Sequence, residues 1–286
     1  MSSLLVIVTL IVTASAAARG TWSPCGLSMV SAINPLAERG RGYRYWLTVL
    51  WFVLGAVAGG ALLGVGAAAV AWLAEPLPAA MAALVGGLGC LVALASDCRL
   101  GGFRLPIHPR QVNERWLMHY RRWLYASGFG FQIGTGFATY IMTAATYLLV
   151  LLAALPGSPG WAMTAGLTFG LVRGAAVVLS SRSRSPESLR ALHLALARFE
   201  PASRHAVIAV EAVAAAVLGV AALAATAGAG SLPATGVLLA VTAALIAALI
   251  AGWARRPGRR SFRADHTGPG ARRPTRRMRQ MTSGAG

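Results

Sequence analysis

Long apolar runs alternate with short polar stretches along this chain, and most of the runs are long enough to cross a membrane. A membrane-spanning helix needs roughly 20 apolar residues to cover about 30 Å of hydrocarbon. Six runs reach that length: 45–73, 76–96, 123–154, 160–180, 205–228 and 232–253. A seventh run, Leu4–Ala18, is shorter and is followed directly by Arg19. The pattern predicts an all-α integral membrane protein with seven transmembrane helices.

The first run fits two interpretations. The sequence Ala14–Ala16 resembles a signal-peptidase site behind a short apolar core, which is typical of a cleaved signal peptide. No basic residue precedes Leu4, however, whereas Arg19 lies after the run. Because positive charge stays in the cytoplasm, this asymmetry favours a retained helix with its N-terminus outside. We predict retention, and cleavage of residues 4–18 stays open as the alternative.

Composition and charge agree with a membrane protein and set its orientation. Hydrophobic residues make up 56% of the chain and charged residues 12%, against about 25% charged in ordinary soluble domains. All 26 basic residues are Arg, and all but Arg19 and Arg173 fall in four stretches: 36–44, 97–122, 181–204 and 255–286. The intervening connections contain none: 74–75, 155–159 and 229–231. This alternation predicts a multi-pass protein of the plasma membrane with its C-terminus in the cytoplasm.

We therefore interpret the net charge of +18 first as a signal of membrane topology and only second as a sign of a binding partner. Residues 254–286 are rich in Arg, Pro and Gly, which predicts a disordered cytoplasmic tail that lies near anionic lipid. We expect no nucleic-acid binding there.

The cytoplasmic loop 97–122 carries Trp116 and Tyr120 at helical spacing among Arg residues, so it predicts an amphipathic helix. That helix would anchor the loop at the membrane or dock a cytoplasmic partner.

Two stretches do not have the pattern of plain spans. Residues 19–35 are small and polar and are interrupted by Pro24, Gly26 and Pro35. Residues 128–147 combine four Gly with several polar side chains. Irregular backbone survives at membrane depth only where protein buries it or where it lines a water-filled cavity. Both stretches therefore predict interrupted helices.

The two interrupted stretches open two blocks of three helices each, so they predict an inverted-topology repeat. The expected organisation is a first repeat, the cytoplasmic loop, a second repeat, an extra transmembrane helix and the tail: 1–96, 97–122, 123–228, 229–253 and 254–286. Matching interrupted helices in two halves point to a membrane site. The polar side chains of the fourth helix are the pathway candidates there: Gln132, Thr135, Thr139 and Tyr140.

Arg173 and Glu211 are the charged residues that fall deep within predicted spans. Buried charges in membranes are costly and are usually paired. One interpretation is a structural ion pair that joins the fifth and sixth helices. The other is a role in relaying protons or ions, which would place both residues on the pathway.

The triplet Ser23–Pro24–Cys25 in the first helix resembles the (S/T)-P-C turn of the CcdA/DsbD transmembrane family. Gly55 and the stretch Phe169–Gly174 support the likeness, which could cover residues 4–228. That family belongs to cytochrome c biogenesis and thiol-disulfide electron transfer. The resemblance implies that Cys25, after Pro24, is a reactive thiol. It also implies two partners, a cytoplasmic thioredoxin-like protein and an extracytoplasmic thiol protein.

The fourth helix departs from the pattern of that family. The family has a second redox Cys there, whereas this chain has Thr135, Ala138 and Thr139. Either Cys90 or Cys98 replaces it, or the redox chemistry has been lost. Two other functions therefore stay open: a small-solute or ion transporter of the same architecture, and a non-catalytic membrane subunit. The scattered acidic, His and Cys residues predict no metal site, and the chain has no motif for a cofactor.

Overall fold

The computed structural model describes residues 2–73, 77–106 and 120–227, and these contain helices and connections without any strand. The predicted seventh helix, the Arg-rich tail and residues 107–119 of the predicted cytoplasmic loop lie outside the described residues. The α-helices are, in chain order, α1 (Ser2–Arg19), α2 (Pro24–Ala32), α3 (Pro35–Gly40), α4 (Tyr45–Leu73), α5 (Ala79–Cys98), α7 (Arg122–Gly134), α8 (Ala145–Ala154), α9 (Pro159–Ala175) and α10 (Pro186–Ala227). Short 3₁₀ helices occupy Gly20–Trp22, Leu100–Gly102 and Ala176–Arg182.

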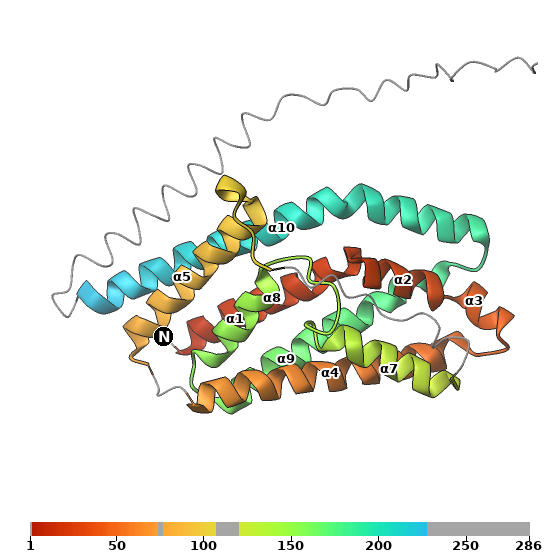
Figure 1. Ribbon diagram of the computed structural model, residues 1–286, viewed down its shortest axis with the longest axis horizontal. Coiled ribbons are helices and arrows are strands. Elements are labelled where there is room, and N and C mark those ends of the chain that lie inside the picture. Colours follow the sequence, from red (N-terminus) through yellow and green to blue (C-terminus); the bar gives the residue numbers. More distant parts are fainter. Residues whose placement is uncertain (1, 74–76, 107–119, 228–286) are drawn as a thin grey trace, which may run out of the picture.

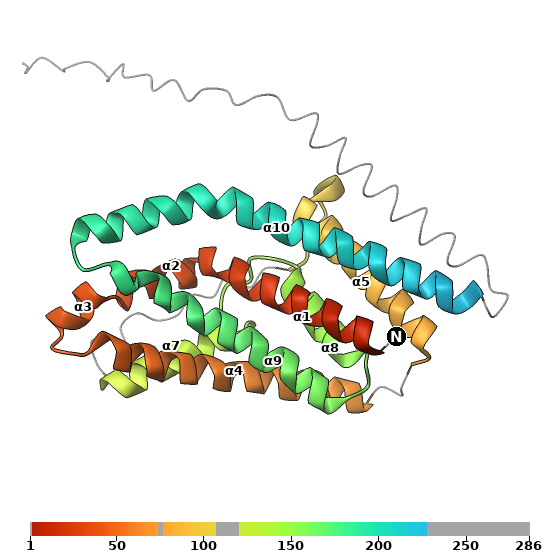
Figure 2. The same ribbon diagram turned by 180° about the vertical axis from the view of Figure 1, so that it is seen from behind.

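Two groups of helices lie on either side of α1 and α8 (Figure 1). Helix α4 packs along α9 and α7 on one side, and α5 packs along α10 on the other. Between the groups lies α1, which contacts α8, α9 and α10 (Figure 2). Helix α1 is therefore enclosed by later parts of the chain, which explains why Val12 and Ala17 are fully buried.

The first predicted interruption lies between α1 and α2. The chain turns through the 3₁₀ helix Gly20–Trp22 and becomes extended at Ser23, with φ −68° and ψ 157°. Ser23 then caps α2, because its Oγ accepts a hydrogen bond from the Gly26 N–H at 3.1 Å. Pro24 occupies the first turn, where its missing N–H costs nothing. The triplet Ser23–Pro24–Cys25 is thus the start of a helix.

The second predicted interruption divides the fourth predicted span into two short helices. Helix α7 ends at Gly134, and α8 begins only at Ala145. Gly136 adopts a positive φ of 70°, a conformation that favours glycine, and it turns the chain out of α7. The single crossing predicted over 123–154 is therefore two helices joined by an irregular segment.

Five helices are long and apolar enough to cross a membrane by length and composition: Ser3–Trp22, Tyr45–Trp72, Ala79–Cys98, Pro159–Arg182 and Pro186–Ala225. The last of these differs from the sequence prediction. Residues 181–204 were expected to form a connection, but from Pro186 onward they form the first half of the continuous helix α10. Its partly buried Leu192 and buried Leu196 pack on the apolar cluster around Cys25 and Met29. That apolar face explains why the Arg-rich stretch is helical.

Glycines let α4 approach both of its neighbours backbone to backbone. A Cβ on Gly60 would lie 2.3 Å from the carbonyl oxygen of Gly166, and a Cβ on Gly166 would lie 2.3 Å from that of Gly60. Toward α7, a Cβ on Gly134 would lie 2.0 Å from the carbonyl oxygen of Ala56. Such contacts leave no room for any larger side chain. Small residues at these crossings hold membrane helices together through close packing.

Gly166→Ala should destabilise the protein by about 1–3 kcal/mol, because the added methyl group forces α9 away from α4. Gly66→Ala in α4 is the matched control, since nothing lies within 4 Å of the position its Cβ would take. The control should leave stability unchanged or raise it slightly through better helix propensity. Thermal unfolding of the purified chain in detergent, followed by Trp fluorescence, measures both. Equal losses in the two variants would contradict the packing argument.

Candidate functional site

The two interrupted helices meet at one small cavity, here called the Arg173 cavity. Its lining includes residues from the first interruption, the second interruption and α9: Gly20, Gly136, Tyr140, Thr143, Thr146 and Arg173. It offers about 10 Å³ to the centre of a water-sized sphere, which is room for about one water molecule. Two stretches that are more than 100 residues apart in sequence thus share one site.

Arg173 brings a positive charge to this cavity. Its side chain is 4% exposed, and Nη2 donates a hydrogen bond to Ser23 Oγ at 3.3 Å. Its Nε and Nη1 have no hydrogen-bond acceptor among the described residues. Gly20 makes the position possible, because a Cβ there would lie 1.4 Å from Nη1 of Arg173. The guanidinium group therefore lies against bare backbone at the first interruption.

The polar residues of the fourth predicted span are divided by the structure. Tyr140 lines the Arg173 cavity, and Thr139 is fully buried with a hydroxyl that has no partner in the described part of the chain. Thr135 instead follows the last turn of α7, where its hydroxyl donates to the Gln132 carbonyl oxygen at 2.8 Å. Gln132 and Thr135 are not among the residues that line the cavity. Two of the predicted candidates, Tyr140 and Arg173, therefore belong to it.

Glu211 lies elsewhere, and the ion pair considered for Arg173 and Glu211 does not form. The Glu211 side chain is fully buried, and neither carboxylate oxygen has a hydrogen-bond partner among the described residues. Its electrostatic neighbours are Cys90 and Asp97, both in α5. Because α10 packs along α5 whereas Arg173 lies on α9, the two charges face different neighbours.

Asp97 is a polar contact that the sequence did not single out. Its carboxylate accepts hydrogen bonds from the Thr143 hydroxyl and from the Ala144 N–H, the latter at 2.8 Å. It thereby caps the start of α8 and fixes the irregular segment that lines the Arg173 cavity. Arg204 of α10 donates to the Asp97 backbone oxygen at 3.0 Å. Asp97 directly follows the third apolar run, which is the sequence signal that could have marked it.

Glu38 is a second buried carboxylate that sequence reasoning missed. Its side chain is fully buried and accepts hydrogen bonds from Arg41 at 2.8 Å, Tyr125 at 2.9 Å and Thr48 at 2.5 Å. These partners come from the end of α3, from α7 and from α4. A carboxylate that is paired and fully hydrogen-bonded suits a structural role. Only the scarcity of acidic residues in the chain could have pointed to it.

Arg19, the charge that follows the first apolar run, is also buried. It forms an ion pair with Glu200 of α10 at 2.5 Å and donates to Ser203 Oγ at 2.6 Å. The contact joins the end of α1 to the middle of α10, close to the first interruption. Glu38 and Asp97 are likewise engaged, and Glu211 faces α5, so no described carboxylate forms an ion pair with Arg173.

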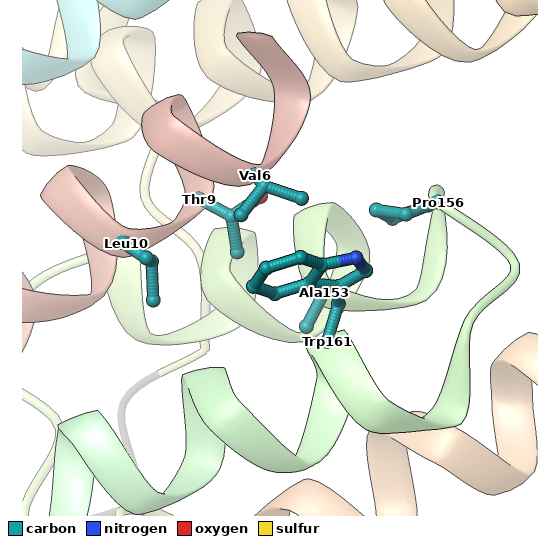
Figure 3. A pocket seen from close by; sticks show the side chains of 6 residues that line it. All are labelled: Val6, Thr9, Leu10, Ala153, Pro156 and Trp161. Atoms are coloured by element: carbon teal, nitrogen blue, oxygen red, sulfur yellow. The ribbon is translucent and has the colours of Figure 1, made fainter. Parts of the chain in front are cut away.

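A separate shallow pocket between α1, α8 and α9 carries no chemistry. Figure 3 shows the Trp161 ring lying below Val6 and Thr9, with Pro156 beside it. The lining is mainly apolar, and the Thr9 hydroxyl already donates to the Leu5 carbonyl oxygen at 2.7 Å. No group of three or more His, Cys, Asp or Glu side chains that could hold a metal occurs within the described ranges.

These features define an all-helical protein with five described helices suitable as membrane spans, in which two interrupted helices enclose a buried cation. Its curated relatives are named methylamine utilization protein MauF. The relative from Paracoccus versutus is 29% identical over 162 residues, or 54% of this chain and 57% of the relative. The relative from Paracoccus denitrificans is 30% identical over 161 residues, covering 54% and 56%. The relative from Methylorubrum extorquens is 29% identical over 160 residues, covering 50% and 51%.

The chain spans about half the length of the curated relatives it matches. No family model matches the chain, and no solved structure matches it.

These relatives correct the assignment made from Ser23–Pro24–Cys25. The chain is similar to proteins named MauF and not to the CcdA/DsbD family, so the expected thiol-disulfide exchange and its role in cytochrome c biogenesis are wrong, and the reactive role of Cys25 loses the resemblance on which it rested. The structure supplies a physical reason for the misleading triplet, because Ser23 and Pro24 begin α2. Cys25 is 1% exposed in one apolar cluster, and Cys90, considered as a substitute, lies in another.

Glu38→Ala should destabilise the protein by about 3 kcal/mol or more, because Arg41 and the Tyr125 and Thr48 hydroxyls lose a common buried acceptor. The exposed acid Glu187 supplies the matched control, and Glu187→Ala should leave stability unchanged. In a double-mutant cycle, Tyr125→Phe should destabilise the wild type but add little once Glu38 is gone. Chemical denaturation in detergent measures the four proteins of the cycle and the Glu187→Ala control. Additive losses from Glu38→Ala and Tyr125→Phe would show that the two residues do not act together.

Proposed function

We propose that this chain is a non-catalytic membrane protein that serves methylamine utilization, in a role like that of the proteins named MauF. The observation that carries the proposal is the similarity of about 29% over some 160 residues to four proteins of that name. An accessory role agrees with the described interior, where the buried acids Glu38 and Asp97 are bound to structural partners.

We further propose seven crossings of the plasma membrane, with the N-terminus outside and the C-terminus in the cytoplasm. Five described helices are suitable as spans by length and composition. The pair α7 and α8 would make one more crossing as an interrupted helix, and residues 232–253 would supply the last. The Arg-rich stretches then fall on the cytoplasmic side, where anionic lipid would neutralise the tail.

The packing of the helices supports an inverted repeat of three helices in each half. In that repeat α4 corresponds to α9 and α5 corresponds to α10, and each of these pairs packs together. The interrupted helix α1–α2 corresponds to α7–α8, and both interruptions line the Arg173 cavity. Pseudo-twofold symmetry would bring related elements together in this way.

Transport of a small solute or ion is a second candidate function. The observation in its favour is the Arg173 cavity, since a buried charge between two interrupted helices is typical of substrate and ion sites in membrane carriers. In that case Tyr140, Thr139 and Arg173 would belong to the pathway.

Deleting the gene for this chain in its host should abolish or strongly slow growth on methylamine as the only carbon source. Growth on a multicarbon substrate should be unchanged, and a plasmid copy of the chain should restore growth on methylamine. Equal growth of the deleted and parent strains on methylamine would overturn the proposed function. Consumption of methylamine by the purified chain alone would overturn the non-catalytic role.

Reporter fusions test the proposed topology. A fluorescent protein that folds only in the cytoplasm should be bright when it is fused after Gly286. Alkaline phosphatase, which is active only outside the cytoplasm, should be active when it is inserted at 155–159 and inactive within 181–204. The reverse pattern would contradict the orientation derived from the Arg distribution.

A further inference from the structure

Arg173 presents an unbalanced charge inside the helix bundle. Arginine stays protonated in proteins, and a desolvated cation is stable only when an opposite charge or several acceptors face it. Three described carboxylates are engaged elsewhere: Glu200 with Arg19, Glu38 with Arg41, and Asp97 with Thr143 and Ala144. Glu211 faces α5. The described chain therefore leaves the counter-charge of Arg173 unassigned.

Arg173 brings hydrogen-bond donors without an acceptor to the Arg173 cavity. Nε and Nη1 of Arg173 carry N–H groups with no acceptor in the described structure, although Arg173 is only 4% exposed. Tyr140, which carries a hydroxyl, also lines the cavity. A convergence of donors on a small enclosed space is the arrangement that binds anions.

The start of α2 adds to the positive potential. Ser23, the N-cap of α2, lies 3.3 Å from Nη2 of Arg173, so the positive end of the helix dipole adjoins the guanidinium group. Two positive groups side by side repel each other unless an anion lies between or beside them. Helix N-termini are common binding positions for anions for this reason.

The size of the cavity limits the anion. It has room for about one water molecule, which excludes phosphate, sulfate and organic acids. From the charge, the free donors and this size, we propose that the Arg173 cavity binds a single halide-sized anion, such as chloride. The anion serves as the counter-ion of Arg173 and joins the two interrupted helices. This inference does not depend on a role in methylamine utilization.

The test is thermal unfolding of the purified full-length chain in detergent, at constant pH and ionic strength, with sodium gluconate replaced stepwise by sodium chloride or bromide. Gluconate is too large for the cavity. A ligand that binds only the folded state raises the melting temperature in a saturable way, by roughly 3 °C at several times its dissociation constant. We expect that rise with chloride and bromide. Equal melting temperatures in gluconate and halide would show that the cavity holds only water.

Variants assign the effect to the site. Arg173→Gln should abolish the halide response, whereas Arg190→Gln, which removes an exposed Arg from α10, should retain it in full. Because loss of Arg173 could prevent folding, Tyr140→Phe provides a milder change that should weaken halide binding several-fold. Gly20→Ala should also reduce the response by displacing the guanidinium group. A response that persists unchanged in Tyr140→Phe and Gly20→Ala would place the halide elsewhere and overturn the proposal.

A variant of Cys25 is needed as a further test, because Cys25 interacts electrostatically with Arg173 and is the other candidate for the negative charge. If the counter-ion is a halide, Cys25→Ser should respond to chloride as the wild type does. If the wild type shows no response and Cys25→Ser gains one, the thiolate is the counter-charge and the halide proposal fails. Crystals grown with bromide should show an anomalous peak beside Arg173 in the wild type and none in Arg173→Gln.

Discussion

The crossing of α4 with α9 and α7 at glycines is the constraint on which the rest of the fold depends. At Gly60 and Gly166 the two backbones approach so closely that neither position tolerates a side chain. In a membrane, where lipid is as apolar as any side chain, this close contact replaces hydrophobic burial as the main attraction between helices. It places α9, and with it Arg173, next to the first interruption. The same helix α4 holds α7, whose end leads into the second interruption, so the two crossings of α4 align both irregular segments.

Polar backbone at the interruptions then has to be satisfied from within the protein. Ser23 caps α2, and Asp97 of α5 caps the start of α8, so each irregular segment is completed by side chains. Glu38 accepts hydrogen bonds from Thr48 and Tyr125 and thereby joins α3 to α4 and α7. The ion pair of Arg19 and Glu200 joins α1 to α10. Many buried polar groups in the described helices thus serve packing, whereas the charged groups of Arg173 and Glu211 keep atoms without a hydrogen-bond partner among the described residues.

The similarity to proteins named MauF changes how the cysteines are interpreted. The motif Ser23–Pro24–Cys25 suggested thiol chemistry. In the structure, however, Ser23 is the N-cap of α2 and Pro24 lies in its first turn. Helix starts of this kind are common for physical reasons, so the motif carries little information about function. The buried charge of Arg173 is a more specific feature, because an unpaired cation inside a membrane protein is costly and rarely occurs without a role.

The sequence by itself determined the helical class and the apolar runs long enough to span a membrane, because bilayer thickness sets a run of about 20 apolar residues for each span. It also located the irregular stretches around Pro24 and Gly136, since proline and glycine act on the local backbone. The tertiary structure alone decided that α10 begins at Pro186, that Arg173 and Glu211 lie apart, and that Gly20 makes room for a guanidinium group. Those facts depend on which helix faces contact each other, and periodicity within one helix does not specify its partner.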